Sequence, residues 1–175
     1  MIIVKYGPVH VNLNNKEEKD LDKGSLVFVK PGDKLLVENR RKDDVEIYVM
    51  EMYTMLKPEE MRSSVTSSFM IDWNDMVYKP HDHGGVMQLF DVTTVMLKRF
   101  DAHITFLTPG MKSHDPHRHI NEEIILMIDG EGEMVLGEKK ERIASGDAAW
   151  VESGILHNIT NIGKKPAIYY AIQWN

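Results

Sequence analysis

Hydrophobic residues along the chain fall in short runs that glycine, proline, asparagine and charged residues separate. Such runs are typical of strands, and a long succession of them with little helical pattern predicts an antiparallel sandwich or barrel. The expected strands are 26–29, 34–37, 46–52, 92–97, 103–107, 123–128, 133–136, 148–151, 157–160 and 167–172. The charged segment 137–142 is expected to be a turn.

One stretch of the chain has a helical pattern. Pro58 suits the first position of a helix, and Glu59 and Glu60 stabilise the positive end of a helix dipole, so a short helix is expected over 57–64. A serine-rich and irregular stretch follows it. We therefore predict three parts, which are a layer of N-terminal strands over 1–56, a linker with the short helix over 57–85, and a complete barrel over 86–175.

An internal repeat relates the two ends of the chain. Three residues recur at a common offset of 122 positions, and the pairs are Gly24 with Gly146, Gly32 with Gly154, and Asn39 with Asn161. At the same offset, Leu35 takes the place of His157. Because the N-terminal copy has an apolar residue where the C-terminal copy has an imidazole, we expect the N-terminal copy to have a structural role only.

Charge and composition exclude several classes of function. The 175 residues include 21 Lys+Arg and 27 Asp+Glu, a net charge of −6, without the basic stripe of nucleic-acid-binding domains. The longest apolar run, 167–172, is far shorter than the roughly 20 residues of a membrane helix. We expect no nucleic-acid or membrane partner, and a cytoplasmic location because no secretion signal is visible. Without cysteine, any metal must be bound by His, Asp or Glu.

The candidate chemistry lies between Gly110 and Gly130 and at one later histidine. In an extended segment His117 and His119 project to the same side and can hold one ion between them. Glu123 begins the next expected strand and His157 begins a later one. Three neutral imidazoles and one carboxylate suit a divalent transition metal ion, which could be Mn, Fe, Ni, Co, Cu or Zn. The alternative is a histidine-rich loop that is solvated surface.

The spacing of these residues resembles the two motifs of the cupin family. The first motif is matched by Gly110, His117, His119, Glu123 and Gly130, and the second by Gly146, Gly154, His157 and Asn161. One extra residue precedes His117, and Glu152 replaces the proline of the second motif. The resemblance spans about residues 92–174 and implies an all-β fold, the double-stranded β-helix or jelly roll of cupins, with additional N-terminal strands. It also implies that the metal ligands are His117, His119, Glu123 and His157.

By the same resemblance, the N-terminal repeat corresponds to the second half of a degenerate cupin barrel. Half a barrel exposes an unpaired edge and an apolar face. The strand 123–128 is also apolar on both faces, since Ile125 and Met127 share the inner side with Glu123 while Ile124, Leu126 and Ile128 point outward. We expect the N-terminal strands, from the same or a swapped subunit, to cover that outer face and to support a homodimer.

Other histidines and acids near the motif have weaker expected roles. His103 lies on a strand and could face the barrel, although a hydrogen-bonded structural histidine is an equal alternative. His114 is expected at the rim of the site and Glu122 in solvent beside Glu123. His81 and His83 repeat the paired spacing without a following acid, which is more typical of a loop than of a second metal site.

The chemistry of such a site predicts a metal-dependent enzyme. A cation in an apolar barrel can polarise a carbonyl or enolate, and a redox-active metal can mediate oxygen chemistry. The expected substrate is a small oxygenated organic molecule, the reaction type that of a dioxygenase, decarboxylase or isomerase, and Glu123 a candidate catalytic base. The alternative is a non-catalytic cupin that binds a small molecule or a metal.

Overall fold

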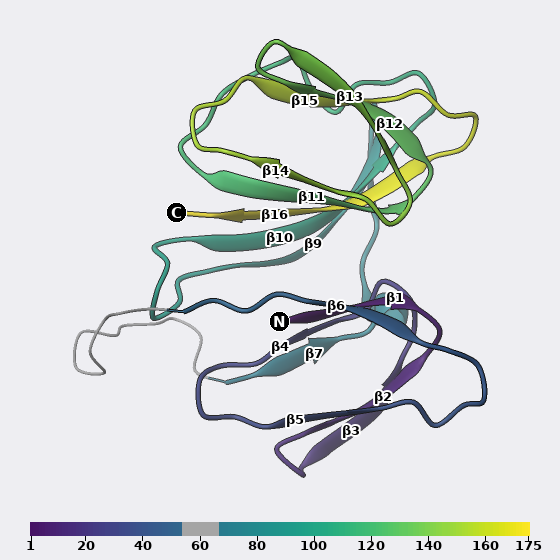
Figure 1. Ribbon diagram of the computed structural model, residues 1–175, viewed down its shortest axis with the longest axis vertical. Helices are drawn as coiled ribbons and strands as arrows, with labels where there is room; N and C mark the ends of the chain where they lie inside the picture. The colour runs from purple at the N-terminus through teal and green to yellow at the C-terminus, as the bar shows by residue number, and fades with distance from the viewer. Residues whose placement is uncertain (54–66) are drawn as a thin grey trace. The chain divides into compact units, whose positions relative to one another are not determined.

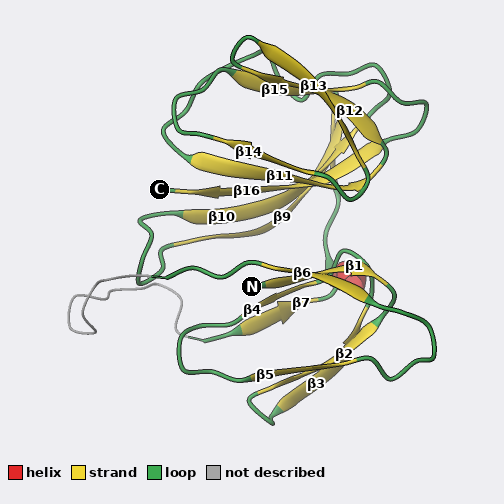
Figure 2. Ribbon diagram, viewed as in Figure 1, coloured by secondary structure: helices red, strands yellow, loops and turns green. Residues whose placement is uncertain are grey.

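The computed structural model describes residues 1–53 and 67–175, and these residues are almost entirely β-structure (Figure 2). The described chain divides into two compact units, Met1–Met76 and Val77–Asn175. The short helix expected over 57–64 lies outside the described residues. The only helical turn of the described chain is the 3-10 helix η2 (Trp73–Asp75), which Asp72 caps through a side-chain oxygen that accepts from the backbone N–H of Asn74.

The N-terminal unit consists of two antiparallel sheets (Figure 1), and an aliphatic core lies between them. The four-stranded sheet has the order β6 (Glu46–Val49), β1 (Ile2–Tyr6), β4 (Leu26–Phe28), β7 (Phe69–Ile71). The three-stranded sheet has the order β3 (Glu17–Leu21), β2 (Val9–Leu13), β5 (Leu35–Glu38). The buried core residues are Ile2, Val4, Val9, Val11, Leu21 and Val27.

The C-terminal unit is a jelly roll of two antiparallel sheets. The six-stranded sheet has the order β14 (Ala148–Val151), β11 (Glu122–Asp129), β16 (Ala167–Trp174), β10 (Phe100–Leu107), β9 (Gly84–Val92), β8 (Lys79–His81). The three-stranded sheet has the order β13 (Lys139–Ala144), β12 (Glu131–Leu136), β15 (His157–Asn161). Ile125 and Met127 of β11 pack in the core together with Met134, Ile143, Ile159 and Tyr169, which confirms the expected inner face of this strand.

Two expected elements are wrong. The range 92–97 is not a strand, because β9 ends at Val92 and the Thr94 hydroxyl accepts from the backbone N–H groups of Met96 and Leu97, which turns the chain. The charged range 137–142 is not a turn as a whole. It turns only at Gly137 and Glu138, and then enters β13, where one residue, Ile143, is buried and the others are exposed. An exposed hairpin strand with few apolar residues has little hydrophobic pattern to recognise.

The range 57–85, expected as a linker, contains strands of both units. β7 pairs with β4 and belongs to the N-terminal sheet, whereas β8 pairs with β9 of the C-terminal sheet. The strands β1, β2, β3 and β9 were also not predicted from the sequence. The division at positions 56 and 85 stays a prediction.

The internal repeat extends to whole strands. β1 pairs with β4 and β6 as β11 pairs with β14 and β16, and β2 pairs with β3 and β5 as β12 pairs with β13 and β15. The β2–β3 hairpin joins Leu13 to Glu17, and the β12–β13 hairpin joins Leu136 to Lys139, so the offset is 123 before these turns and 122 after them. The paired glycines of the repeat all adopt positive φ, between 77° and 95°. The two units therefore share a six-strand plan.

Candidate metal centre

Three segments bring the predicted ligands to one end of the C-terminal barrel. Glu123 lies near the start of β11 and faces inward with Ile125 and Met127, and His157 is the first residue of β15. The loop that carries His117 and His119 is joined to this strand by backbone hydrogen bonds. His117 N donates to His157 O at 3.2 Å, and His157 N donates to His117 O at 3.0 Å. The backbone of the loop thus fixes the histidine pair beside His157.

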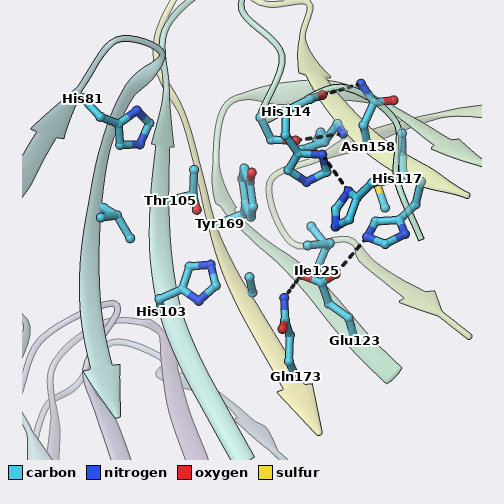
Figure 3. A pocket seen from close by; sticks show the side chains of 16 residues that line it. His81, His103, Thr105, His114, His117, Glu123, Ile125, Asn158, Tyr169 and Gln173 are labelled. Carbon is cyan, nitrogen blue, oxygen red and sulfur yellow. Dashed lines mark hydrogen bonds and ion pairs between the residues drawn. The ribbon is translucent and has the colours of Figure 1, made fainter. Parts of the chain in front are cut away.

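The closest group of donor atoms consists of His119, Glu123 and His157. Glu123 Oε2 lies 3.4 Å from His119 Nε2 and 3.3 Å from His157 Nε2, and each of the three ligand atoms lies within 4.8 Å of the others. The side chains are 19%, 6% and 3% exposed, in chain order. Figure 3 shows Glu123 below the rings of His114 and His117, on the same side of the cavity. Such a convergence of nitrogen and carboxylate donors fits a transition metal ion.

Hydrogen bonds of the Nδ1 atoms determine which nitrogen of each imidazole faces the carboxylate. His119 Nδ1 lies 2.8 Å from the carbonyl oxygen of Asn121, and His157 Nδ1 lies 2.9 Å from that of Ile155. A carbonyl can only accept, so both Nδ1 atoms carry the proton and both Nε2 atoms present a lone pair. Both Nε2 atoms are buried, and neither makes a well-oriented hydrogen bond within the described part of the chain. This orientation is the one that metal-binding histidines adopt.

The charges of the site are coupled. Burial opposes the ionised form of Glu123, but the adjacent His157 imidazole, the hydrogen bond from Gln173 and the nearby His119 imidazole outweigh it and hold the pKa of this carboxyl below its ordinary value. Burial also opposes the charged form of His157, but the Glu123 carboxylate and the Ile155 carbonyl raise its pKa. Burial and the neighbouring imidazoles lower the pKa of His117. The acid is therefore ionised and ready to bind a cation.

His117 belongs to a second group, which His157 joins to the first. His114, His117 and His157 have donor atoms within 4.8 Å of one another. The Nδ1 atoms of His114 and His117 are 3.0 Å apart, and the rings of His117 and His157 have centroids 4.7 Å apart. The structure thus brings all four predicted ligands to one end of the barrel, and it adds His114, which was expected at the rim.

A cavity of about 270 Å³ adjoins this cluster. Its lining includes His114, His117, Glu123 and His157, and on other strands His81, His103, Tyr169 and Gln173. The role of Gln173 was not anticipated. Its Nε2 donates to Glu123 Oε1 at 3.3 Å, because Gln173 of β16 lies directly opposite Glu123 of β11. Only the pairing of these distant strands reveals this contact, and no local sequence signal does.

Comparisons with known proteins agree with this architecture. A family model described as "Cupin domain" matches residues 103–173. No curated protein matches the sequence. Among solved structures, the chain resembles protein Ylba from E. coli with a TM-score of 0.70 and 16% identity, over 99% of this chain and 66% of that one.

Two further structures are similar. The putative glyoxylate induced protein from Pseudomonas aeruginosa has a TM-score of 0.76 and 15% identity, over 99% of this chain and 64% of that one. An RmlC-like cupin from Shewanella frigidimarina has a TM-score of 0.51 and 15% identity, over 65% of this chain and 94% of that one. The chain thus spans just under two thirds of two of these structures. Within the described residues, no helix is long and apolar enough to cross a membrane.

Proposed function

The C-terminal unit contains a cupin domain, which the family model matches over residues 103–173, and from this premise we propose that its barrel binds one divalent transition metal ion and acts as an enzyme on a small oxygenated organic substrate. One observation carries the proposal. Two imidazoles, the half-buried His119 and the buried His157, direct buried Nε2 atoms without a hydrogen-bond partner toward the same ionised carboxylate, Glu123. Unsatisfied buried nitrogens cost stability, so a site that keeps two of them fits a ligand that is a cation.

The proposed ligands are His117, His119, Glu123 and His157. His119, Glu123 and His157 already face one another, and His117 can join them by exchanging its contact with His114 for the cation. Mn, Fe, Ni, Co, Cu and Zn all suit three imidazoles and one carboxylate. Gln173, which donates to Glu123, holds the carboxylate in place, as partners of metal ligands commonly do.

The cavity beside the cluster supports a small-molecule substrate. Its volume of about 270 Å³ suits a molecule of a few carbon and oxygen atoms, and its walls combine apolar side chains such as Ile125 with imidazoles and hydroxyls. A bound cation would supply Lewis-acid polarisation of a substrate oxygen. Glu123 remains a candidate base where it is not a ligand.

Metal titration of the purified protein tests the proposal. Stripped wild-type protein should bind close to one equivalent of Mn²⁺, Ni²⁺ or Zn²⁺ by isothermal titration calorimetry. His157→Ala should fold and lose about 100-fold or more in affinity, because a ligand is removed. The matched control is His10→Ala, which removes a buried histidine of the N-terminal unit and should leave the affinity unchanged. Absence of binding by the wild type, or full occupancy of His157→Ala, would contradict the assignment.

Turnover distinguishes an enzyme from a cupin that only binds. Oxygen uptake and product formation are measured with diketones, catechols and keto acids as substrates of the metal-loaded protein. Turnover that His157→Ala abolishes supports the enzyme. Tight retention of one small molecule without turnover would favour the non-catalytic alternative.

We also propose that the protein is a homodimer, in which the half-buried side chains of Ile124 and Ile128 on the outer face of β11 gain a cover. Light scattering at micromolar concentration tests the oligomeric state. A single species near twice the chain mass of 20.1 kDa is expected, and a monomer would contradict it.

A further inference from the structure

A second polar pair faces the cavity from a wall that carries none of the proposed metal ligands. His103 lies on β10, which β16 separates from the strand of Glu123, and both residues line the same cavity. Figure 3 shows the His103 ring across the cavity from His117, with Thr105 and Tyr169 nearby. A substrate in the cavity would therefore lie between the cluster and His103.

A buried carboxylate holds this imidazole. His103 Nδ1 lies 3.0 Å from Asp101 Oδ1, and the Asp101 side chain is 4% exposed. Asp101 also accepts a hydrogen bond of 2.8 Å from Gln88 Nε2, and Arg99 Nη2 lies 3.7 Å away. Burial opposes the charge of Asp101, but these donors and charges hold its pKa below the ordinary value. An ionised acceptor keeps the proton of His103 on Nδ1, which leaves Nε2 as a base.

An irregularity of the sheet occurs at this position. The pairing of β10 with β9 shifts between Ala102 and His103, so that His103 is opposite Gln88 rather than Leu89. Such bulges redirect side chains and are common beside active sites. The shift places Gln88 where it can support Asp101, so one residue of β9 and one of β10 combine to orient the His103 ring.

We propose that His103 is a catalytic proton acceptor and that Asp101 is its positioning residue, for a small keto acid or hydroxyketone bound between His103 and the metal-ligand cluster. This inference rests on the proposed function and narrows its substrate class to carbonyl compounds with an acidic neighbouring C–H bond. The arrangement is that of a general base oriented by a third group, with an electrophile on the opposite side.

The proton transfer is balanced without any further reactant. His103 Nε2 takes a proton from the carbon next to the carbonyl, and the electron pair of that C–H bond becomes the C=C bond of an enolate. The negative charge moves to the carbonyl oxygen, where the cation of the proposed site would stabilise it. The proton on Nε2 exchanges with solvent, and a solvent proton returns from Nε2 to the same carbon, which gives isotope exchange. In a hydroxyketone, the proton can instead go to the former carbonyl carbon while the hydroxyl proton moves to the former carbonyl oxygen, and the C=O bond forms at the neighbouring carbon, which gives isomerisation.

Deuterium exchange provides the test. Metal-loaded wild-type protein is incubated in D₂O with pyruvate, 2-oxobutyrate or hydroxyacetone, and deuterium incorporation at the carbon next to the carbonyl is measured by mass spectrometry against buffer with free metal. Exchange of at least one probe is expected. His103→Gln, which keeps a polar side chain near Asp101, should slow it about 100-fold or more. Absence of exchange with all three probes, or exchange by His103→Gln at the wild-type rate, would overturn the proposal.

The N-terminal unit offers a matched control. His10 Nδ1 lies 2.8 Å from Asp20 Oδ1, a pair of the same chemistry on a different sheet. His10→Gln should exchange at the wild-type rate, and a loss like that of His103→Gln would contradict the assignment to His103.

The role of Asp101 has a readout that does not depend on activity. Long-range ¹H–¹⁵N NMR of metal-free protein should show His103 protonated at Nδ1, and Asp101→Asn should shift the tautomer and slow exchange about tenfold or more. An unchanged tautomer would contradict the positioning role. The two proposals can fail separately. If calorimetry shows no metal binding but the metal-free protein still exchanges deuterium and needs His103 to do so, the metal site is wrong and the role of His103 stands.

Discussion

The two units share a strand plan and differ in what they place at one end of it. The inner positions of β11 and β12 at Ile125, Met127 and Met134 correspond to Ile2, Val4 and Val11, so both interiors are aliphatic. At the first position of β15, however, His157 corresponds to Leu35 of β5. Two such units show that the fold depends on the apolar positions, whereas the polar cluster is an addition that the same fold does not need.

The asparagine of the repeat shows the same relation in its hydrogen bonds. Asn161 Nδ2 donates to Lys165 O at 2.8 Å, and its Oδ1 accepts from Gly163 N. Asn39 makes the equivalent bonds, to Asp43 O at 2.8 Å and from Arg41 N. Asn161 alone also donates to Leu107 O, at 2.7 Å, and it is fully buried. The shared part of the pattern forms the turn, and the added bond joins that turn to β10.

The largest difference in stability is expected at this asparagine pair. Asn161→Ala leaves the buried carbonyl of Leu107 without its donor and removes two turn hydrogen bonds, so it should cost about 3 kcal/mol. Asn39→Ala at an exposed turn should cost under about 1 kcal/mol. Urea denaturation of both variants measures the free energy of unfolding. An equal loss of unfolding free energy at both positions would contradict the proposed difference between the two units.

Exchanging the residues at the first positions of β15 and β5, His157 and Leu35, tests whether metal binding depends on His157. His157→Leu gives the C-terminal unit the residue of its counterpart, and it should keep the fold while metal affinity falls about 100-fold or more, or about 2.7 kcal/mol. Leu35→His should create no site, because one added imidazole is not a ligand set, and both groups of potential ligands among the described residues lie in the C-terminal unit. Calorimetric metal titration measures both. A second binding event in Leu35→His would contradict the account.

Metal affinity should depend on pH in one direction. Imidazoles must be neutral to bind a cation, so affinity should fall as the pH drops below about 6.5, and the raised pKa of His157 extends proton competition above that value. Glu123, with its pKa lowered, stays ionised throughout this range. Titrations between about pH 5.5 and 8 measure the slope. Affinity that is independent of pH would exclude histidine ligands.

The metal-free protein should show a smaller and opposite trend above neutrality. His157 has a raised folded pKa, so its stabilisation is complete below about pH 6.5 and is lost as the pH rises through the folded pKa. Glu123 has a lowered folded pKa, so its stabilisation is present above the reference value of 4.5 and is lost as the pH falls through the folded pKa. The His157–Glu123 pair should therefore stabilise the metal-free protein most between about pH 4.5 and 6.5. Thermal unfolding at several pH values measures this stabilisation, which should be absent in His157→Leu.

Local patterning predicted the all-β class, and the resemblance to the cupin motifs implied the jelly roll and the set of metal ligands. The motif spacing from Gly110 to Gly130 and from Gly146 to Asn161 has a direct physical meaning, since Gly110, Gly130, Gly146 and Gly154 turn the chain at positive φ. The alternation along β11 likewise placed Glu123, Ile125 and Met127 on one face. Such features are local, and local pattern is what a single sequence contains.

The site residues that the sequence did not predict depend on contacts between distant parts of the chain. Gln173 supports Glu123 only because β16 pairs with β11, and Asp101 holds His103 where the β9 pairing shifts. His114 reaches His117 through the path of a loop that no periodicity describes. Exposed strands such as β3 and β13 bury few residues, so their hydrophobic pattern is too weak to recognise.

Anomalous X-ray scattering at the absorption edge of the loaded metal tests the central claim most directly. Crystals of the metal-bound protein should show one peak in the C-terminal unit, about 2.0–2.3 Å from Nε2 of His119, Nε2 of His157 and a carboxylate oxygen of Glu123. The N-terminal unit should show none at the position of Leu35. A metal bound elsewhere, or full loading without contact to His157 and Glu123, would contradict the account.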